Sequence, residues 1–236
     1  MSKDELERLV REAYEHWIKF VEFMDERTHT RWVFRGVGSP THLFVPSVGR
    51  STAYNALDEV RVFRAFQRSA GSMLETSLSN DWEWLAVAQH HGLPTRLLDW
   101  STNPLVACFF AVASGSQDDD AVVHSFSISE EYTVDPGKHS DPFAIDKVLF
   151  LLPTKTAARI VNQRGLFSVH PKPDVPWDSG NIASFTIPAR MRARFRRRLF
   201  KMGVDHSHIY PDLGGLCETL KWRYEAGIGI GTPMIG

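Results

Sequence analysis

Residues 89–111 constrain the fold of this chain more tightly than any other stretch, because they place a helix end, a strand and a helix start in direct succession. Gly92 and Pro94 stop the first helix. Thr95–Trp100 follow as an apolar run that is short enough for a buried strand. Asn103–Pro104 begin the next helix, with asparagine as the N-cap and proline at the first helical position. The sequence therefore predicts a helix–strand–helix unit here.

This unit carries more polar side chains than a buried core requires. They lie on or beside its connections: His90, His91, Arg96, Asp99, Ser101 and Thr102. Binding and catalytic residues concentrate on such connections. Ordinary structure explains any one of these residues, but their concentration favours a functional site.

A second informative stretch is Arg31–Gly36, which alternates as a strand does. Trp32 and Phe34 fall on one face, and Val33 and Arg35 fall on the other. A guanidinium in so apolar a strand is costly unless it meets a negative charge. Two partners remain open for it: a bound anion, or a buried carboxylate of this chain.

These two stretches resemble the FRG domain, a family named for the tripeptide Phe34-Arg35-Gly36. Further positions that look like that family's pattern are Pro46-Ser47, Arg50, Gln163, Gly165, Phe167, Tyr210-Pro211-Asp212 and Gly215-Leu216. The resemblance runs from about Arg31 to Leu220. It implies a bacterial domain of the kind suggested to act as a toxin or in defence against phage.

Composition indicates one globular domain of enzyme size. The chain has 236 residues, of which 43% are apolar and 23% are charged, with a formal net charge of -1. A sizeable core is therefore possible, and net charge gives no general attraction to nucleic acid or membrane. Cys108 lies in an apolar helical run, as a reduced core thiol does. We find no signal peptide or membrane span and expect a cytoplasmic protein.

The chain opens with an amphipathic helix. Ser2 and Glu5 form a capping-box pattern, and the apolar residues that follow keep helical spacing. We expect residues 1–28 to form a docking helix, either for this chain's own core or for a protein partner such as an antitoxin. Residues 29–226 then form the FRG-like catalytic domain, and the glycine-rich residues 227–236 form a flexible tail.

The order of the remaining elements predicts an α+β fold with helices early and strands late. Beyond the strands described above, strands are expected at 122–128, 147–152, 166–169 and 182–187. Helices are expected at 56–73, 82–91, 104–113, 156–163, 189–202 and 212–222. Such a chain forms a single domain with a mixed or antiparallel sheet core flanked by helices.

This element order resembles the ADP-ribosyltransferase fold, whose early strand carries an arginine or histidine that grips NAD. Arg35-Gly36 looks like that first motif, and Ser101-Thr102 looks like the second, which lies beneath the nicotinamide ribose. The resemblance implies that NAD is the substrate and that Arg35 binds its pyrophosphate, a group that a planar guanidinium suits well. The residues expected at the cofactor site are then Arg35, Gly36, Thr95, Arg96, Ser101 and Thr102.

The third motif of those enzymes is missing. They place a glutamate on a late strand, where it hydrogen-bonds the ribose 2′-hydroxyl. No Glu-x-Glu or Gln-x-Glu pair stands on a late strand here. Candidate substitutes are Gln163 just before a strand, Glu218 in an amphipathic helix, and Asp99 within the densest polar group.

The histidines allow a different chemistry, hydrolysis of a phosphoryl or nucleic-acid substrate. His90 or His91 would act as the general base, oriented by Asp99. Arg35 or Arg96 would stabilise an oxyanion. Adjacent helical residues point about 100° apart, so one histidine is expected to face the site. The pair lacks the i, i+4 spacing of helical metal ligands, and no metal is expected.

Residues 190–201 point to a third class of function. They are rich in arginine, and Met191, Phe195 and Leu199 keep helical spacing. A helix with such a basic outer face either binds the phosphates of RNA or DNA, or stays solvated beside acidic neighbours.

From these patterns we expect a bacterial effector or toxin-like enzyme that binds NAD and transfers ADP-ribose to a protein or nucleic-acid acceptor. In this interpretation His91 and Asp99 polarise the reacting group. The alternatives are a phosphoryl- or nucleic-acid-directed hydrolase and a non-catalytic nucleic-acid-binding module.

Overall fold

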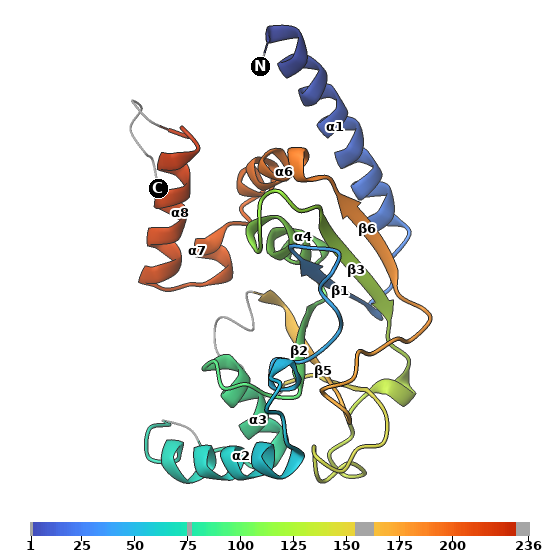
Figure 1. Ribbon diagram of the computed structural model, residues 1–236, viewed down its shortest axis with the longest axis vertical. Helices are drawn as coiled ribbons and strands as arrows, with labels where there is room; N and C mark the ends of the chain where they lie inside the picture. The colour runs from blue at the N-terminus through green and yellow to red at the C-terminus, as the bar shows by residue number, and fades with distance from the viewer. Residues whose placement is uncertain (1, 75–76, 154–162, 230–236) are drawn as a thin grey trace.

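Figure 1 shows the computed structural model, which describes residues 2–74, 77–153 and 163–229. Its strands form one sheet in the order β4-β5-β2-β1-β3-β6, and all neighbouring strands are antiparallel. The strands are β1 (Trp32–Val37), β2 (Leu97–Ser101), β3 (Ala121–Ser127), β4 (Leu149–Leu151), β5 (Gly165–Val169) and β6 (Ala183–Ile187). The predicted α+β class, with one antiparallel sheet flanked by helices, is confirmed.

The sheet is weakest between β1 and β2. Strand β1 pairs with β3 along its whole length, but it shares only the register pair Phe34↔Ser101 with β2. Strand β2 in turn pairs with β5 along its whole length. The sheet therefore consists of two halves joined at Phe34 and Ser101, and Figure 1 shows β1, β3 and β6 above β2 and β5.

Helices cover one face of both halves. The β1-β3-β6 half packs against α1 (Lys3–Asp25), α4 (Pro104–Ala113) and α6 (Ala189–Lys201). The β2-β5-β4 half packs against α2 (Ala56–Ala70) and α3 (Asp81–His90). The chain ends in α7 (His206–Ile209) and α8 (Leu213–Glu225), which pack on each other. Each half thus has a hydrophobic core of its own on this face.

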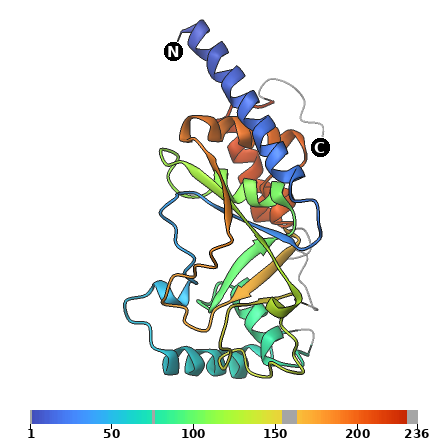
Figure 2. The same ribbon diagram turned by 90° about the vertical axis from the view of Figure 1, so that its right-hand side faces the viewer.

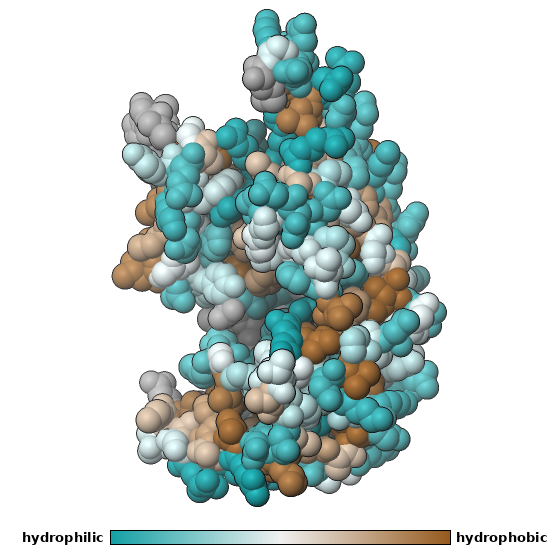
Figure 3. All heavy atoms as spheres, viewed as in Figure 1, coloured by the Kyte–Doolittle hydropathy of each residue, from teal (hydrophilic) through white to brown (hydrophobic). Residues whose placement is uncertain are grey.

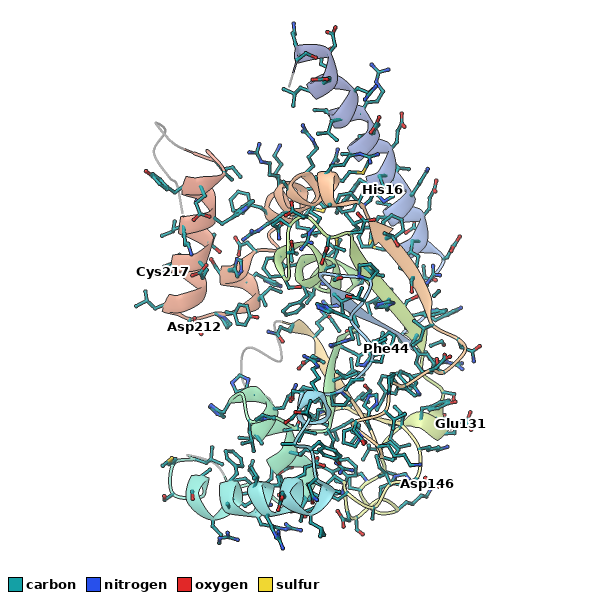
Figure 4. The ribbon with its side chains drawn as sticks, in the orientation of Figure 1. His16, Phe44, Glu131, Asp146, Asp212 and Cys217 are labelled. Atoms are coloured by element: carbon teal, nitrogen blue, oxygen red, sulfur yellow. The ribbon has the colours of Figure 1, made fainter. Side chains whose placement is uncertain are left out.

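The opposite face is covered by connecting segments instead of helices. Two of them include the short turns η1 (Val48–Arg50) and η2 (Glu130–Tyr132). Aromatic residues from these segments pack on the strands: Phe44 stacks on Trp100 with ring centroids 5.9 Å apart, and Trp177 meets Phe126 at 5.2 Å. Figure 4 labels Phe44 in front of the sheet. This face holds the side chains of alternate strand residues, including Arg35.

The first helix forms as its capping residues predict. Both hydrogen bonds of the Ser2–Glu5 capping box are present. Trp17, Phe20 and Phe23 are buried in the core between α1, α4 and β6, so the later half of α1 docks on this chain. The first turns extend past the rest of the molecule, as Figure 2 shows.

Most predicted elements match the structure within a few residues, and the range of α4 matches the predicted 104–113. The short helix α7 was not predicted, because four residues give no readable periodicity. The predicted helix at 156–163 lies outside the described residues apart from Gln163, and the expected tail is described only as far as residue 229. None of the described helices combines the length and apolar character needed to cross a membrane.

Candidate functional site

Arg35 lies where the two halves of the sheet meet. Its Nη1 donates a hydrogen bond of 2.6 Å to the main-chain oxygen of Asp99, beside the only register pair of β1 and β2. The side chain is half-buried. Among the residues that the structure describes, no carboxylate oxygen lies within 4.0 Å of its guanidinium. Of the two partners that the sequence left open, the buried carboxylate is absent from the described residues, which favours a bound anion.

Two histidines share this face with Arg35. His124 lies directly across from Arg35 in the β1–β3 register, and His170 follows the end of β5. Burial lowers the pKa of His124 to about 4 and that of His170 to about 3, and the charge of Arg35 adds to both shifts. Burial also lowers the pKa of Arg35, and nearby Arg50 adds to that shift against the opposing effect of Asp99. At neutral pH the positive charge of this region therefore resides on the arginines.

Serines of neighbouring strands hold both histidines in place. The Nδ1 of His124 lies 2.8 Å from the hydroxyl of Ser184 on β6. The Nε2 of His170 lies 2.9 Å from the hydroxyl of Ser168, which also accepts a bond from the indole of Trp100. These histidines were not identified from the sequence. The available signal was a polar residue within the strand pattern of β3 for His124 and one directly after β5 for His170, and many strands contain such residues.

The Asp99 carboxylate points to the other side of the junction. It is exposed and accepts a 3.1 Å bond from the side-chain amide of Gln89, whose oxygen in turn accepts from Thr95 at 2.7 Å. Asp99, Gln89, His90 and Gln163 line a recess of about 40 Å³. That volume holds a few water molecules or one hydroxyl group, not a whole ligand.

One residue of the recess contacts α7. The side-chain amide of Gln163 donates to the main-chain oxygen of Ile209 in α7 at 3.3 Å, and Gln89 and His90 of α3 line the recess with it. Figure 3 shows the surface hollowed between α7 and α8 on one side and α2 and α3 on the other. Gln163 therefore lies beside Asp99, as its candidate role requires.

Of the two adjacent histidines, the structure brings His90 to the recess and leaves His91 outside it. His91 is exposed and caps the end of α3, where its main-chain N–H bonds to the oxygen of Val87. Adjacent residues at a helix end point in different directions, and only His90 lines the recess that Asp99 lines. We therefore correct the sequence-based choice: His90, not His91, is the histidine placed to work with Asp99.

The Ser-Thr pair is divided between two environments. Ser101 is buried, where its hydroxyl donates 2.6 Å to the main-chain oxygen of Gln163 and accepts from the N–H of Asn103. Thr102 is exposed in a separate cavity of about 630 Å³, together with Arg31 and Glu131. Figure 4 shows Glu131 on the side of the molecule away from α8. Ser101 thus joins β2 to the chain before β5. We predicted that its hydroxyl contacts the ribose, and we correct this prediction because both of its hydrogen bonds are made within the chain.

Arg96 is paired with a carboxylate of this chain, whereas the sequence-based prediction placed it at the ligand. Its guanidinium forms a bidentate ion pair with Glu59 of α2, with distances of 2.9 Å and 2.7 Å. Both side chains are buried, with exposed fractions of 3% and 4%. The ring of Phe143 lies 4.6 Å from the guanidinium carbon. Thr95 is buried as well and bonds to Gln89 and to Ser47, so both residues support the site from behind.

Close packing against α4 explains why residue 36 is glycine, with no need for a ligand. A Cβ atom at this position would overlap the main-chain oxygen of Ala107 and the N–H of Ala111 in α4. The helix can approach β1 this closely only because residue 36 has no side chain. Gly36 therefore sets the position of α4 against the strand that carries Arg35.

Glu218 lies apart from these residues. It is exposed on α8, and its carboxylate is 3.9 Å from Lys221 on the same helix. Glu218 therefore belongs to the solvated face of α8 and not to the candidate site.

The arginines of α6 do not all lie on one free basic face as predicted. Arg192 is buried and donates to the main-chain oxygens of Gly38, Ala111, Val112, Ser114, Ser116 and Asp119. Arg196 lies over the ring of Trp222, at 4.7 Å, and Arg198 over that of Tyr14, at 5.0 Å. Helical periodicity placed these residues on the outside, but partners distant in the sequence enclose Arg192, and aromatic rings cover Arg196 and Arg198 in part. This weakens the prediction that residues 190–201 bind RNA or DNA.

Comparison with known proteins agrees with the resemblance noted in the sequence. The family model of the FRG domain matches residues 30–120, which begin just before β1 and end just before β3. No curated protein and no solved structure matches the chain. The matched part contains Arg35, Gly36 and Asp99, and thus both sides of the sheet junction. Residues 30–120 of this chain therefore match the FRG domain.

Proposed function

We propose that this protein binds NAD at Arg35 and transfers ADP-ribose to a protein or nucleic-acid acceptor, as an effector or toxin-like enzyme. The observation that carries the proposal is the state of Arg35. It is half-buried at a break in the sheet and bonds to a main-chain oxygen, without an ion pair among the described residues. An arginine in this state suits a ligand with a compact negative charge, such as a pyrophosphate.

The surroundings of Arg35 support an anionic ligand. Arg50 lies close enough to influence the pKa of Arg35, and no charge of His124 or His170 competes for the anion at neutral pH. A charge-assisted bidentate contact to phosphate contributes roughly 1.5–3 kcal/mol, or about ten- to a hundredfold in affinity.

In this proposal Asp99 performs the task of the missing late-strand glutamate. Its carboxylate accepts one bond from Gln89 and is otherwise exposed, so it has oxygen lone pairs for a ribose hydroxyl. The recess beside it admits only the edge of a ribose, and the remainder of NAD lies outside. The hydrogen bond between Arg35 Nη1 and the Asp99 main chain joins the two residues, while the Asp99 carboxylate points to the other side of the junction, so in this proposal NAD spans the junction between β1 and β2.

The chemistry follows from these positions. The bond between nicotinamide and the ribose carbon breaks, and nicotinamide leaves with the electron pair. The Asp99 carboxylate stabilises the positive charge that develops on the ribose, as carboxylates do in other glycosyl transfers. A nucleophilic group of the acceptor then bonds to the ribose carbon and loses its proton to water. Gln89 holds the Asp99 carboxylate in position, and Ser101 holds the chain just before β5.

Nicotinamide release and NAD binding test this proposal together. Arg35→Lys keeps the charge but loses the bidentate fork, so calorimetry with millimolar NAD should show affinity lower by ten- to a hundredfold. Asp99→Asn should retain binding and lose release of nicotinamide. The exposed residues Arg61 and Asp146 provide the matched controls Arg61→Lys and Asp146→Asn. Absence of NAD binding to the wild-type protein would contradict the proposal.

One observation favours a second candidate function, hydrolysis of a phosphodiester. His90 and Asp99 line the same recess, as a general base and its orienting carboxylate do. The test is turnover of bis(4-nitrophenyl) phosphate. Turnover that is lost in His90→Gln would favour the hydrolase over the transferase.

A further inference from the structure

We propose that the groove between α1 and α6 docks an acidic segment of a partner protein, anchored by apolar side chains. This inference is independent of the proposed chemistry at Arg35. The groove has a volume of about 390 Å³ and is lined by Val10, Ala13, Arg194, Arg197, Arg198, Phe200, Lys201 and Ile228.

The floor of the groove is apolar. Val10 and Ala13 contribute from α1, and Phe200 and Ile228 contribute from the later part of the chain. Val10 remains 45% exposed, and the exposed residues Leu6 and Tyr14 lie four positions to either side of it. These three residues form one stripe along α1, whose first turns extend past the rest of the molecule in Figures 1 and 2. An apolar stripe beside a concave floor provides a contact surface for apolar side chains of a partner.

One wall of the groove is basic. Arg194, Arg197, Arg198 and Lys201 follow the i, i+3, i+4, i+7 spacing of a single helix face. Within the described ranges none of the four forms an ion pair. Arg197 donates to the main-chain oxygen of Ala226 at 2.8 Å, and Arg198 lies over the ring of Tyr14. Both partners are uncharged, so the positive charges of the two arginines remain uncompensated.

The same helix already binds a carboxylate of α1. Arg190, one turn before this wall, lies 3.5 Å from Glu12. A partner that continues this pattern along the groove presents carboxylates to the basic wall and apolar side chains to the floor. An amphipathic acidic helix has both features at matching spacing.

The shape of the groove favours such a segment over a membrane or a nucleic acid. A lipid surface is flat on this scale and does not reach a concave floor. A phosphate backbone has no apolar groups for Val10 and Phe200. A helical segment fits both the floor and the wall, because the groove runs beside two helices.

A designed peptide serves as the probe: an amphipathic helix with leucine on one face and glutamate on the other, labelled with fluorescein. Its binding to the full chain is followed by fluorescence anisotropy, with a lysine-for-glutamate peptide as the comparison. We expect the acidic peptide to bind and the lysine peptide to fail. Added salt should weaken binding, because the basic wall is solvent-accessible.

Variants of the groove locate the binding site. Arg194→Glu with Lys201→Glu should weaken binding at least about tenfold, and so should Val10→Asp. The matched controls lie on α2, where Arg68 and Leu57 are exposed: Arg68→Glu and Leu57→Asp should bind as the wild type does. If a charge reversal prevents folding, judged by thermal unfolding, the milder pair Arg194→Gln with Lys201→Gln replaces it.

Three results would overturn the inference. The first is equal binding of the acidic and lysine peptides. The second is binding that the α2 controls weaken as much as the groove variants do. The third is a protein that ignores the acidic peptide but binds phosphatidylserine vesicles or RNA through the same groove residues. NAD binding is measured on the same variants and should not change, which separates this inference from the proposed function.

Discussion

Replacing Arg96 by methionine should destabilise the folded protein by about 3–5 kcal/mol, the usual cost of breaking a buried ion pair by removing one partner. The reason lies with Glu59. Its side chain is 4% exposed and now accepts bonds of 2.9 Å and 2.7 Å from the guanidinium. After the change its charge remains buried, with a single 3.0 Å hydrogen bond from the hydroxyl of Tyr54.

The double variant Arg96→Met with Glu59→Leu should recover most of this loss. Both changes replace charged groups by apolar groups of similar volume, and such replacements are often neutral. A coupling free energy of about 2 kcal/mol or more is therefore expected between the two positions. The milder change Tyr54→Phe removes one hydrogen bond and should cost about 1 kcal/mol.

Urea unfolding followed by tryptophan fluorescence measures these free energies, because Trp82 lies in the same hydrophobic core as Leu97. NAD binding of the folded single variant should match that of the wild type. Two results would refute the reasoning: a stable Arg96→Met variant, or a double variant as unstable as the single one. In either case Arg96 would be free to act as the ligand-binding residue that its sequence position suggested.

Three further changes test the fold around the site. Gly36→Ala should lower stability by several kcal/mol and alter near-UV circular dichroism, since its Cβ overlaps the main chain of α4. Arg192→Met leaves several main-chain oxygens without their donor and should cost more than about 3 kcal/mol in urea unfolding, while Arg194→Met should cost little. His124 and His170 are neutral when folded, with pKa values of about 4 and 3, but gain a proton near pH 6.5 when unfolded. Stability should therefore be full above about pH 6.5 and decrease as the pH falls toward those values, by up to about 1.4 kcal/mol per pH unit for each histidine, and His170→Gln should reduce this slope.

Local signals in the sequence predicted the elements around the site well. Asn103 caps α4 through a 2.9 Å bond from the N–H of Leu105, and Pro104 occupies the first helical position. The apolar run before them became β2, shifted slightly toward Ser101. These features depend on residues a few positions apart, so their chemistry can be read directly from the chain.

Partners distant in the sequence explain what could not be predicted. Arg96 lies in the same polar stretch as Asp99, yet its carboxylate comes from α2. Arg192 has the spacing of an exposed residue, but oxygens from the chain near Gly38 and from the segment after α4 enclose it. The weak pairing of β1 with β2, which leaves Arg35 beside the main chain of Asp99, follows from how the two halves pack against separate helices.

A crystal structure of the protein with NAD tests the central claim most directly. We expect a pyrophosphate oxygen within about 3 Å of an Arg35 Nη atom. The ribose next to nicotinamide should lie beside the Asp99 carboxylate, with Gln89 still donating to that carboxylate. NAD bound in the cavity of Thr102 and Glu131 with Arg35 uninvolved would contradict the account, as would crystals grown at millimolar NAD that contain no ligand density near Arg35.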